Sequence, residues 1–582
     1  MNKRKLFLFL SPILVIYFGW LSINFLQINS QLKKIKNHTA ENQLEKLEQD
    51  NLKLSDKIKQ TNFLLKILPN IGIIKDTKQV LELIGQTNSF VEDCFNLSKT
   101  GSQLFAAVIN NQQNNFNNAF PAWKIQTIEL EHQFQQLTKD IEKNQNNKIL
   151  KKLNLETENI SSQITEKMFL LRQFNNYLPE FLGVEKEKRY LVLLQNNMEL
   201  RPTGGFMGSY ALVSFQNGVM KNLEVQDIYV PDGQVKGHIE PPSPIQQAFR
   251  LGDWRLRDAN WSPDFTTSAE VVLWFFDKGG VKNIDGLFAL NLNLVIDMLK
   301  DIGPIKLVDY NEEVNQDNIY RVAQYYSENE FFPGSTQKKD FLSVLAKGLI
   351  EKVKTSSQVN FVPLVQTLLN NLNNGEILLN FKNKDLQKII ANQNWDGVLK
   401  KIPQPSIGSS ILQDYLAIYE TNLGVNKANC CIERKTIHNI LTSEGRLYHS
   451  VILELKNENK INEPTPPKYW GGRYVNYLRF IIPKEAQIEK ITIDGSLISE
   501  KAISVEDEKN NLKSVGFFAN VDALTTKRIE CVYSLSLNDE KSYQLTIHKQ
   551  SGIKSSPQFI YSNMVSEIKS NLEKSEVFEF KI

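Results

Sequence analysis

The N-terminus constrains this chain more than any other segment, because it joins a basic tip to a long apolar run. Lys3, Arg4 and Lys5 precede residues 6–26, which include no charged side chain. A helix of that length, rising about 1.5 Å per residue, crosses a hydrocarbon core of about 30 Å. Basic residues stay on the cytoplasmic side of a membrane. We therefore predict a cytoplasmic tip and transmembrane anchor over residues 1–29, with the bulk of the chain extracytoplasmic.

A cleaved signal peptide is the alternative interpretation of this segment. The apolar core of a signal peptide usually spans about 7–15 residues and ends at small side chains. Here Trp20, Leu21 and Phe25 occupy the region where cleavage would occur. A retained signal-anchor is therefore favoured. Because no second long apolar run follows, we expect a single-pass protein of the cell membrane.

The composition excludes several classes of function. Among 582 residues, 68 Lys and Arg stand against 65 Asp and Glu, a net charge of +3. Chains that bind nucleic acids usually carry a strong basic excess, so no nucleic-acid partner is expected. The sequence contains neither an HExxH pair nor a GxxxxGK[ST] loop. It therefore predicts neither zinc-metalloprotease chemistry nor P-loop nucleotide hydrolysis.

Residues 30–183 have the pattern of a helical stalk or bundle. Apolar residues recur at spacings of three and four within residues 44–58, 130–141 and 160–171, which is typical of amphipathic helices. These helices either form a dimerising stalk with a short coiled coil, which would make the chain a homo-oligomer, or pack as a hairpin on the next domain. The hairpin is slightly favoured, since no stripe continues over several heptads.

Residues 184–402 are predicted to form an α/β layered domain with trailing helices. Strands are expected at 190–194, 206–215, 223–228 and 283–290, and helices at 267–277, 292–301 and 338–401. Strands that alternate with helices indicate a sheet covered by helices.

Two polar loops of this domain carry candidate site residues. Arg201 lies just before Gly204 and Gly205, and glycines let a backbone approach a ligand closely. Arg257 and Asp258 begin a second charged cluster ahead of a predicted helix. These side chains either line a ligand-binding cleft or brace their own loops.

The motifs of the domain resemble those of the bacterial domain-of-unknown-function 4012 family. The resemblance rests on YLVLLQNNMELRPTGGFMGSY, LRDANWSPDF and DGLFALNLNLVIDMLKDIGPI. It runs over residues 188–350 and continues more weakly into the C-terminal region. The family name implies no activity, and the resemblance implies a membrane-anchored bacterial envelope protein.

The order of elements is also distantly similar to the LytR-CpsA-Psr family, whose members transfer glycopolymers from polyprenyl-pyrophosphate carriers to the cell wall. That resemblance implies that Arg201 corresponds to a loop arginine and Asp227 to the aspartate of an Arg-Asp pair. It further implies that Lys338 and Lys339 belong to a later basic helix. Gln226 stands where the arginine of the pair would be, and an asparagine stands near the place of a family aspartate.

The chemistry of such a transfer defines the predicted site. Basic groups must hold a pyrophosphate, and carboxylates, directly or through Mg²⁺, must position the acceptor hydroxyl. We predict catalytic roles for Arg201, Asp227, Arg257 and Asp258, with Asp227 and Asp258 as candidate Mg²⁺ ligands. We predict ligand-binding roles for Thr203, Gly204, Gly205, Asp264, Lys338 and Lys339.

Residues 403–582 are predicted to form a β-sandwich. Apolar and polar residues alternate within 451–455, 529–537 and 543–547, which is typical of short half-buried strands. Aromatic residues gather within 469–477, including Tyr474. Packing in a core is favoured for them over a carbohydrate-binding platform.

The four cysteines, Cys94, Cys430, Cys431 and Cys531, are too few for a disulfide framework and lack CxxC spacing. Cys430 and Cys431 are adjacent, so on a strand they would face opposite sides. Only one of them could then readily pair with Cys531. The predicted extracytoplasmic location permits oxidation.

The chain is thus predicted to be a multidomain α+β protein with two candidate functions. One is a membrane-tethered, Mg²⁺-assisted transferase of a polyprenyl-pyrophosphate-linked glycopolymer. The other is a non-catalytic envelope scaffold that binds a cell-wall polymer. The transferase requires Arg201, Asp227 and Arg257 to meet at the mouth of an apolar groove. Arginines bound by their own neighbours would favour the scaffold.

Overall fold

The computed structural model describes residues 23–24, 26–35, 44–69, 72–153, 157–250, 252–328, 337–400, 410–460, 471–538, 540–564 and 567–582. The chain divides into two compact units, Met1–Leu182 and Gly183–Ile582. Almost all of the anchor predicted over residues 1–29 lies outside the described residues. Within the ranges given above, no helix combines the length and the apolar character that a membrane crossing requires.

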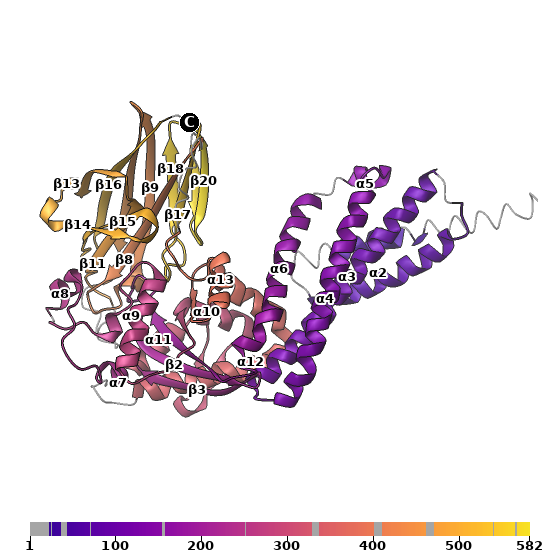
Figure 1. Cartoon of the computed structure of the whole chain (residues 1–582), viewed down its shortest axis with the longest axis horizontal. Helices are drawn as coiled ribbons and strands as arrows, with labels where there is room; N and C mark the ends of the chain where they lie inside the picture. Colours follow the sequence, from indigo (N-terminus) through magenta and orange to yellow (C-terminus); the bar gives the residue numbers. More distant parts are fainter. Residues whose placement is uncertain are drawn as a thin grey trace, which may run out of the picture. The chain divides into compact units, whose positions relative to one another are not determined.

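The first unit is helical, as its amphipathic stripes predicted (Figure 1). Its helices are α2 (Leu44–Leu65), α3 (Gly72–Ile109), α4 (Gln113–Lys143), α5 (Lys148–Leu153) and α6 (Thr157–Phe181). Leu54 and Ile58 of α2 are buried in one cluster with Leu81 of α3. Leu130 and Phe134 of α4 are buried in a second cluster that also takes in α3 and α6. The stripes of the different helices therefore pack on one another within the chain.

The second unit contains a mixed five-stranded sheet with the strand order β3-β2-β1-β4-β7. Its strands are β1 (Lys188–Asn196), β2 (Phe206–Gln216), β3 (Val219–Asp227), β4 (Gly286–Asn291) and β7 (Ile377–Phe381). β1 and β4 are parallel, and the other neighbouring strands are antiparallel.

Helices cover both faces of this sheet. Leu191 and Leu193 of β1 face a core that includes residues of α9 (Phe265–Lys278). Val192, between them in sequence, faces the opposite side and packs with Leu342 of α12 (Gln337–Asn373). Because successive side chains of a strand point to opposite faces, a continuous apolar run such as β1 suits a sheet buried on both sides. The layered α/β arrangement agrees with the expectation.

The remaining short elements of this domain complete the helical layers and edges. They are α7 (Tyr229–Asp232), α8 (Ser243–Phe249), η1 (Leu256–Asp258), α10 (Leu292–Ile302), β5 (Ile305–Leu307), η2 (Val308–Tyr310), β6 (Glu312–Val314), α11 (Ile319–Glu328) and α13 (Lys384–Asn392).

One predicted helix was wrong in part. Residues 338–401 were expected to be helical throughout, but α12 ends at Asn373 and β7 follows it. The apolar residues of β7 pair with β4 and complete one edge of the sheet. Tertiary pairing therefore overrides the helical pattern of the flanking sequence.

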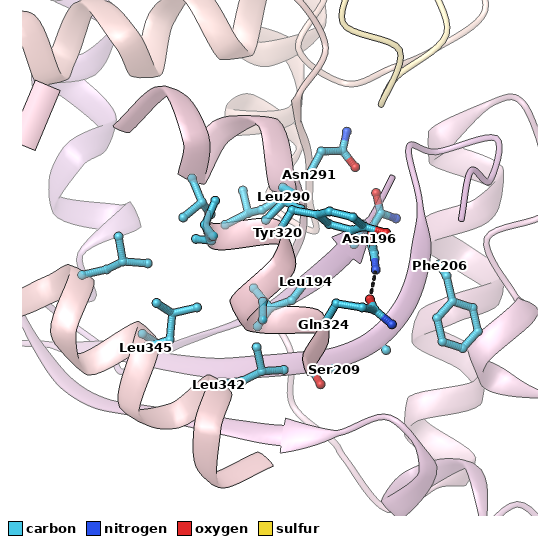
Figure 2. Close-up of a pocket in the computed structure, with 18 of the residues that line it drawn as sticks. Leu194, Asn196, Phe206, Ser209, Leu290, Asn291, Tyr320, Gln324, Leu342 and Leu345 are labelled. Carbon is cyan, nitrogen blue, oxygen red and sulfur yellow. Dashed lines mark hydrogen bonds between the residues drawn. The ribbon is translucent and has the colours of Figure 1, made fainter. Parts of the chain in front are cut away.

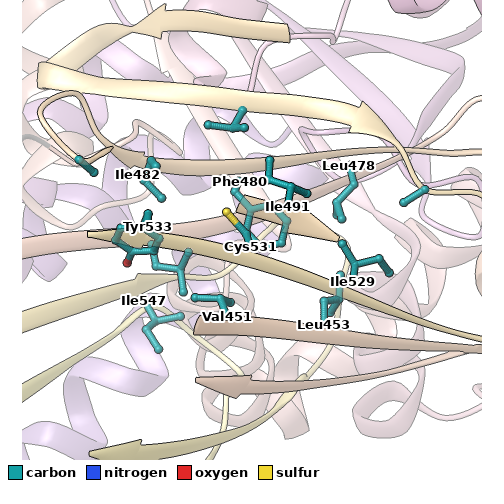
Figure 3. Close-up of a cluster of buried hydrophobic side chains, with 14 of the residues drawn as sticks. Val451, Leu453, Leu478, Phe480, Ile482, Ile491, Ile529, Cys531, Tyr533 and Ile547 are labelled. Atoms are coloured by element: carbon teal, nitrogen blue, oxygen red, sulfur yellow. The ribbon is translucent and has the colours of Figure 1, made fainter. Parts of the chain in front are cut away.

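The C-terminal part of the second unit is a β-sandwich, as predicted (Figure 1). One sheet has the order β13-β12-β16-β10-β9-β18-β19 and the other β14-β15-β11-β8-β17-β20. The strands are β8 (Ile411–Asn422), β9 (Ile432–Ser443), β10 (Arg446–Asn457), β11 (Asn476–Pro483), β12 (Gln487–Ile493), β13 (Ser496–Leu497), β14 (Ser504–Glu508), β15 (Leu512–Phe518), β16 (Thr526–Ser536), β17 (Ser542–His548), β18 (Pro557–Ser562), β19 (Ile568–Asn571) and β20 (Glu576–Lys581). Figure 3 shows side chains of both sheets meeting in one core, among them Leu453 and Phe480.

The aromatic cluster of the sandwich is only partly described. Tyr474 is buried and its hydroxyl donates to Glu420 at 2.9 Å. Tyr477 is also buried. Both side chains therefore belong to the packed interior, whereas Tyr469 and Trp470 lie outside the described residues.

The disulfide expectation was wrong. Cys430 and Cys431 bond to each other, and Cys531 is buried and unbonded in the sandwich core (Figure 3). The two adjacent cysteines lie in the 3₁₀ helix η3 (Ala428–Cys431) rather than on a strand. Their side chains are therefore not forced to opposite faces, and no contact with Cys531 is needed.

Candidate functional site

Arg201 lies in the loop between β1 and β2 and is buried. Its Nη2 atom donates hydrogen bonds to Glu199 Oε1 at 3.1 Å and to Asp258 Oδ1 at 3.2 Å. Nη1 donates to the backbone carbonyl of Asn422, at the end of β8 in the sandwich. The guanidinium is thus held by two carboxylates and by the adjacent domain.

Three further charges extend this contact into what we call the ion cluster: Glu199, Arg201, Asp232, Arg257, Asp258 and Lys427. Lys427 Nζ lies 2.5 Å from Glu199 Oε2. Arg257 Nη1 lies 2.8 Å from Asp232 Oδ2, and its Nε lies 3.7 Å from Asp258 Oδ2. Asp258 therefore lies between both predicted arginines. The cluster contains three cations and three carboxylates, so its formal charge is zero.

The two carboxylates nearest Arg201 respond differently to burial. Burial raises the pKa of Glu199, but Lys427 and Arg201 together outweigh burial and leave that pKa below its ordinary value. Burial also raises the pKa of Asp258, and there the opposing effects of Arg201 and Arg257 are smaller. Glu199 is accordingly the firmly ionised partner of the cations.

The other predicted catalytic residue has a local role. Asp227 Oδ1 accepts a hydrogen bond from the backbone N–H of Tyr229 at 2.9 Å, at the start of α7. The oxygens of the second candidate Mg²⁺ ligand, Asp258, face two guanidiniums. In the part of the chain that the structure describes, no group of three or more His, Cys, Asp or Glu side chains is arranged to hold a metal ion.

The loop residues Thr203, Gly204 and Gly205 pack closely against neighbouring parts of the protein. Thr203 Oγ1 accepts from Gln195 Nε2 at 2.7 Å and from Asn260 Nδ2 at 2.8 Å. A Cβ on Gly204, whose φ is +129°, would lie 2.1 Å from the Asn291 side chain. A Cβ on Gly205 would meet the backbone of β1 at 2.4 Å. The glycines are required for these approaches within the protein.

Of the remaining predicted ligand-binding residues, Asp264, Lys338 and Lys339, only Asp264 has a described side chain, and it lies outside the ion cluster. Asp264 is the N-cap of α9 and accepts from Thr267 N at 2.9 Å, a role typical of aspartate. Lys338 and Lys339 lie on α12, but their side chains fall outside the described part of the chain.

A cavity of about 200 Å³ lies on the α12 face of the sheet. Figure 2 shows its lining side chains, which come from the ends of β1, β2 and β4 and from α10, α11 and α12. Most of the lining is aliphatic: Leu194, Leu290, Leu292, Val295, Ile319, Ala323, Leu342, Leu345, Ala346 and Leu349. A cavity with such a lining favours an apolar ligand.

Polar side chains gather in another part of the same cavity. Figure 2 places Asn196, Tyr320 and Gln324 together, away from Leu345. Asn196 Nδ2 lies 3.4 Å from Gln324 Oε1, a long contact. Gln324 Nε2 and Ser209 Oγ are buried and have no hydrogen-bond partner among the described residues.

The ion cluster and the cavity adjoin each other at Phe206 and Lys427, which also line the cavity. Arg201 Cζ lies 5.4 Å and Lys427 Nζ 5.7 Å from the centre of the Phe206 ring. The structure thus places Arg201 near the cavity and joins it to Arg257 through Asp258, but each guanidinium is bound to carboxylates of the protein.

Sequence reasoning missed the polar residues of the cavity. Ser209 and Gln324 are uncharged and lie on β2 and α11, more than one hundred residues apart. Ser209 and Asn196 belong to a quoted motif, but nothing in their spacing indicates a shared cavity. One general rule could have pointed to this region, because ligands of α/β proteins often bind at the ends of the strands of the sheet.

Comparison with known proteins supports the family assignment of one segment. Residues 185–326 match the family model described as "Protein of unknown function (DUF4012)". That segment contains Arg201, the residues of η1 and part of the cavity wall, and the match confirms this part of the expected resemblance. No curated protein matches the chain.

Similarity to solved structures is low. The Lin1025 protein from Listeria innocua is 15% identical with a TM-score of 0.21, over 36% of this chain and 80% of that chain. Leukotriene A4 hydrolase from Saccharomyces cerevisiae is 12% identical with a TM-score of 0.17, over 26% of this chain and 29% of that chain. Similarity at these scores supports no argument about function.

Proposed function

We propose that the central domain binds the hydrocarbon chain of an envelope lipid and that the chain acts as a binding protein. The cavity between the sheet and helices α10, α11 and α12 is the single observation that carries this proposal. An apolar chain removed from water contributes roughly 0.8 kcal/mol for each buried methylene group. The anchor predicted over residues 6–26 would place this cavity outside the cytoplasm.

Transfer of a glycopolymer from polyprenyl pyrophosphate is the second candidate. That reaction needs basic groups that can hold a pyrophosphate. Arg201 lies near the cavity, which favours this candidate, but Arg201 and Arg257 are both bound to Asp258 and each to a further carboxylate. The geometry therefore supports binding more than transfer.

Photolabelling of the full chain tests the proposal. The probe is a dodecane that carries a diazirine and no polar head. We expect it to label peptides of α11 and α12, and we expect Ala346→Trp, which fills the cavity, to reduce labelling about tenfold or more, since an occupied cavity leaves no room for the chain.

The matched control is Val308→Trp, because Val308 is 85% exposed and lies outside the cavity lining. It should leave labelling unchanged. A thermal melt of each variant verifies folding. Equal labelling of the wild type and of folded Ala346→Trp would contradict the proposal.

A further inference from the structure

We infer that the lipid held in this cavity has an uncharged head group with a hydroxyl or carbonyl oxygen, and that a phosphate or pyrophosphate head is disfavoured. This inference rests on the proposed function and specifies the class of its ligand. Three properties of the site support it: the pairing of the nearby charges, the unpaired neutral groups, and the end of helix α10.

The charges beside the cavity are already matched. Lys427 is the single charged side chain among the described lining residues, and it is bound to Glu199. Glu199 is buried and its pKa is lowered, so it stays ionised beside the lysine. A phosphate would have to displace this carboxylate or enter as an unmatched buried charge, which is unfavourable by several kcal/mol.

Among the described residues, Ser209 Oγ and Gln324 Nε2 have no hydrogen-bond partner. Ser209 is 1% exposed and Gln324 is 4% exposed, and both line the cavity. Gln324 Nε2 can only donate, whereas the Ser209 hydroxyl can donate or accept. A buried polar group without a hydrogen bond is costly, so a ligand that supplies one oxygen acceptor gains affinity by satisfying these groups. Such an oxygen needs no charge.

The N-terminus of α10 lies at the same cavity. Its N-cap, Asn291, makes no side-chain capping hydrogen bond, and Asn291, Leu292 and Val295 all line the cavity. The first N–H groups of a helix have no partner within the helix and carry a partial positive charge. They therefore also suit an oxygen acceptor.

The size of the cavity limits the part of the ligand that it encloses. A volume of about 200 Å³ is smaller than the roughly 300–1,000 Å³ of pockets that enclose a whole drug-sized ligand. A segment of one alkyl chain and a small head fit this space. A long polyprenyl chain would extend well beyond it.

Competition against the dodecane probe on the full chain tests the head group. Dodecanol, dodecyl phosphate and dodecane share one chain length. Each is titrated as a mole fraction of the same detergent, and the concentration that displaces half of the probe is measured. We expect dodecanol to displace the probe at a concentration about tenfold lower than dodecyl phosphate, the factor that corresponds to about 1.4 kcal/mol.

Substitutions in the cavity test whether Ser209 and Gln324 bind the hydroxyl group of dodecanol. Ser209→Ala and Gln324→Leu should each raise the dodecanol concentration needed by about five- to tenfold, as expected for one lost hydrogen bond, and leave that of dodecane unchanged. Ser443→Ala, at an exposed position, is the matched control and should change neither.

The outcomes separate the two proposals. Equal or better competition by dodecyl phosphate, or equal competition by dodecane and dodecanol, would overturn the inference about the head group while lipid binding stands. Probe labelling that is insensitive to Ala346→Trp would instead remove the proposed function, whatever the competitors do.

Discussion

Most of the ion cluster is buried, as are Ser209 and Gln324 of the cavity, and both regions adjoin Phe206, yet they differ in one decisive respect. Each charge of the ion cluster has an oppositely charged partner within 3.7 Å. In the cavity, Ser209 Oγ and Gln324 Nε2 have no partner among the described residues. A buried group that is fully paired stabilises the fold, whereas a buried group left unpaired requires an explanation such as a ligand or water. Charge alone is therefore a poor guide to the unpaired buried groups of this protein.

The ion cluster joins two parts of the second unit. Arg201 and Glu199 belong to the central domain, and Lys427 belongs to the sandwich side. Backbone contacts accompany the charges: Asn422 N donates to Leu200 O at 2.9 Å. The cluster thus fixes the loop between β1 and β2 against the sandwich, and this loop leads into the strand that carries Ser209.

The largest effect on stability is expected from a substitution that breaks the ion cluster. Arg201→Met leaves Glu199 and Asp258 without their shared cation in a buried site, and we expect the free energy of unfolding of the second unit to fall by roughly 3–5 kcal/mol. Urea titration of the full chain measures the change. The control is Arg528→Met, which breaks an exposed pair with Glu454 and should cost about 0–1 kcal/mol. A loss for Arg201→Met no larger than that of the control would mean that the cluster does not stabilise the fold.

A second experiment measures how the stability that the ion cluster confers depends on pH. Because the pKa of Glu199 is lowered in the folded state, the stability that its charge confers is fully present above its ordinary pKa of 4.5 and is lost as the pH falls through the lower folded value. Glu199→Gln should therefore cost roughly 3 kcal/mol near neutral pH, and this difference from wild type should shrink in acid. Unfolding curves at several pH values measure it. A difference that grows as the pH falls would contradict the assignment.

A smaller effect concerns the bond between Cys430 and Cys431, which lies in η3, the 3₁₀ helix that begins directly after Lys427. The bond closes a very short loop, so it removes little entropy from the unfolded chain and contributes about 1 kcal/mol in the chain-entropy model. We expect the double variant Cys430→Ser, Cys431→Ser to lose about that much in urea titration. A loss close to that of Arg201→Met would show instead that η3 is needed to hold Lys427 in the ion cluster.

The smallest expected effect is on the cavity side of the comparison. Ser209→Ala removes a hydroxyl that has no partner, so the free energy of unfolding of the ligand-free chain should change by less than about 0.5 kcal/mol. Thr203→Ser and Thr203→Ala form the matched series, since Thr203 Oγ1 accepts two buried hydrogen bonds. The serine variant keeps this acceptor, and the alanine variant should lose about 1–3 kcal/mol more than Ser209→Ala does. Equal losses for Ser209→Ala and Thr203→Ala would remove the distinction between the paired and unpaired groups.

Local sequence patterns determined much of the fold. Continuous apolar runs in β1 and β4 and the three-four spacing in the first unit predicted the correct element types, since burial on both faces of a sheet and on one face of a helix imposes these periods directly. β7 was missed because its five residues follow a long helix and become a strand by pairing with β4, a contact that local sequence does not encode.

The candidate site depended on tertiary structure to a greater degree. The sequence by itself determined that Arg201 stands in a glycine-rich loop and that the chain carries an apolar run at its N-terminus. Only the folded chain decided that Arg201 meets Asp258, 57 residues away, and that Lys427 meets Glu199, 228 residues away. A charged side chain binds a ligand or a neighbour according to which is nearest in space. That proximity arises when the sheet, the helices and the sandwich pack together, and the same packing brings Ser209 and Gln324 to one cavity.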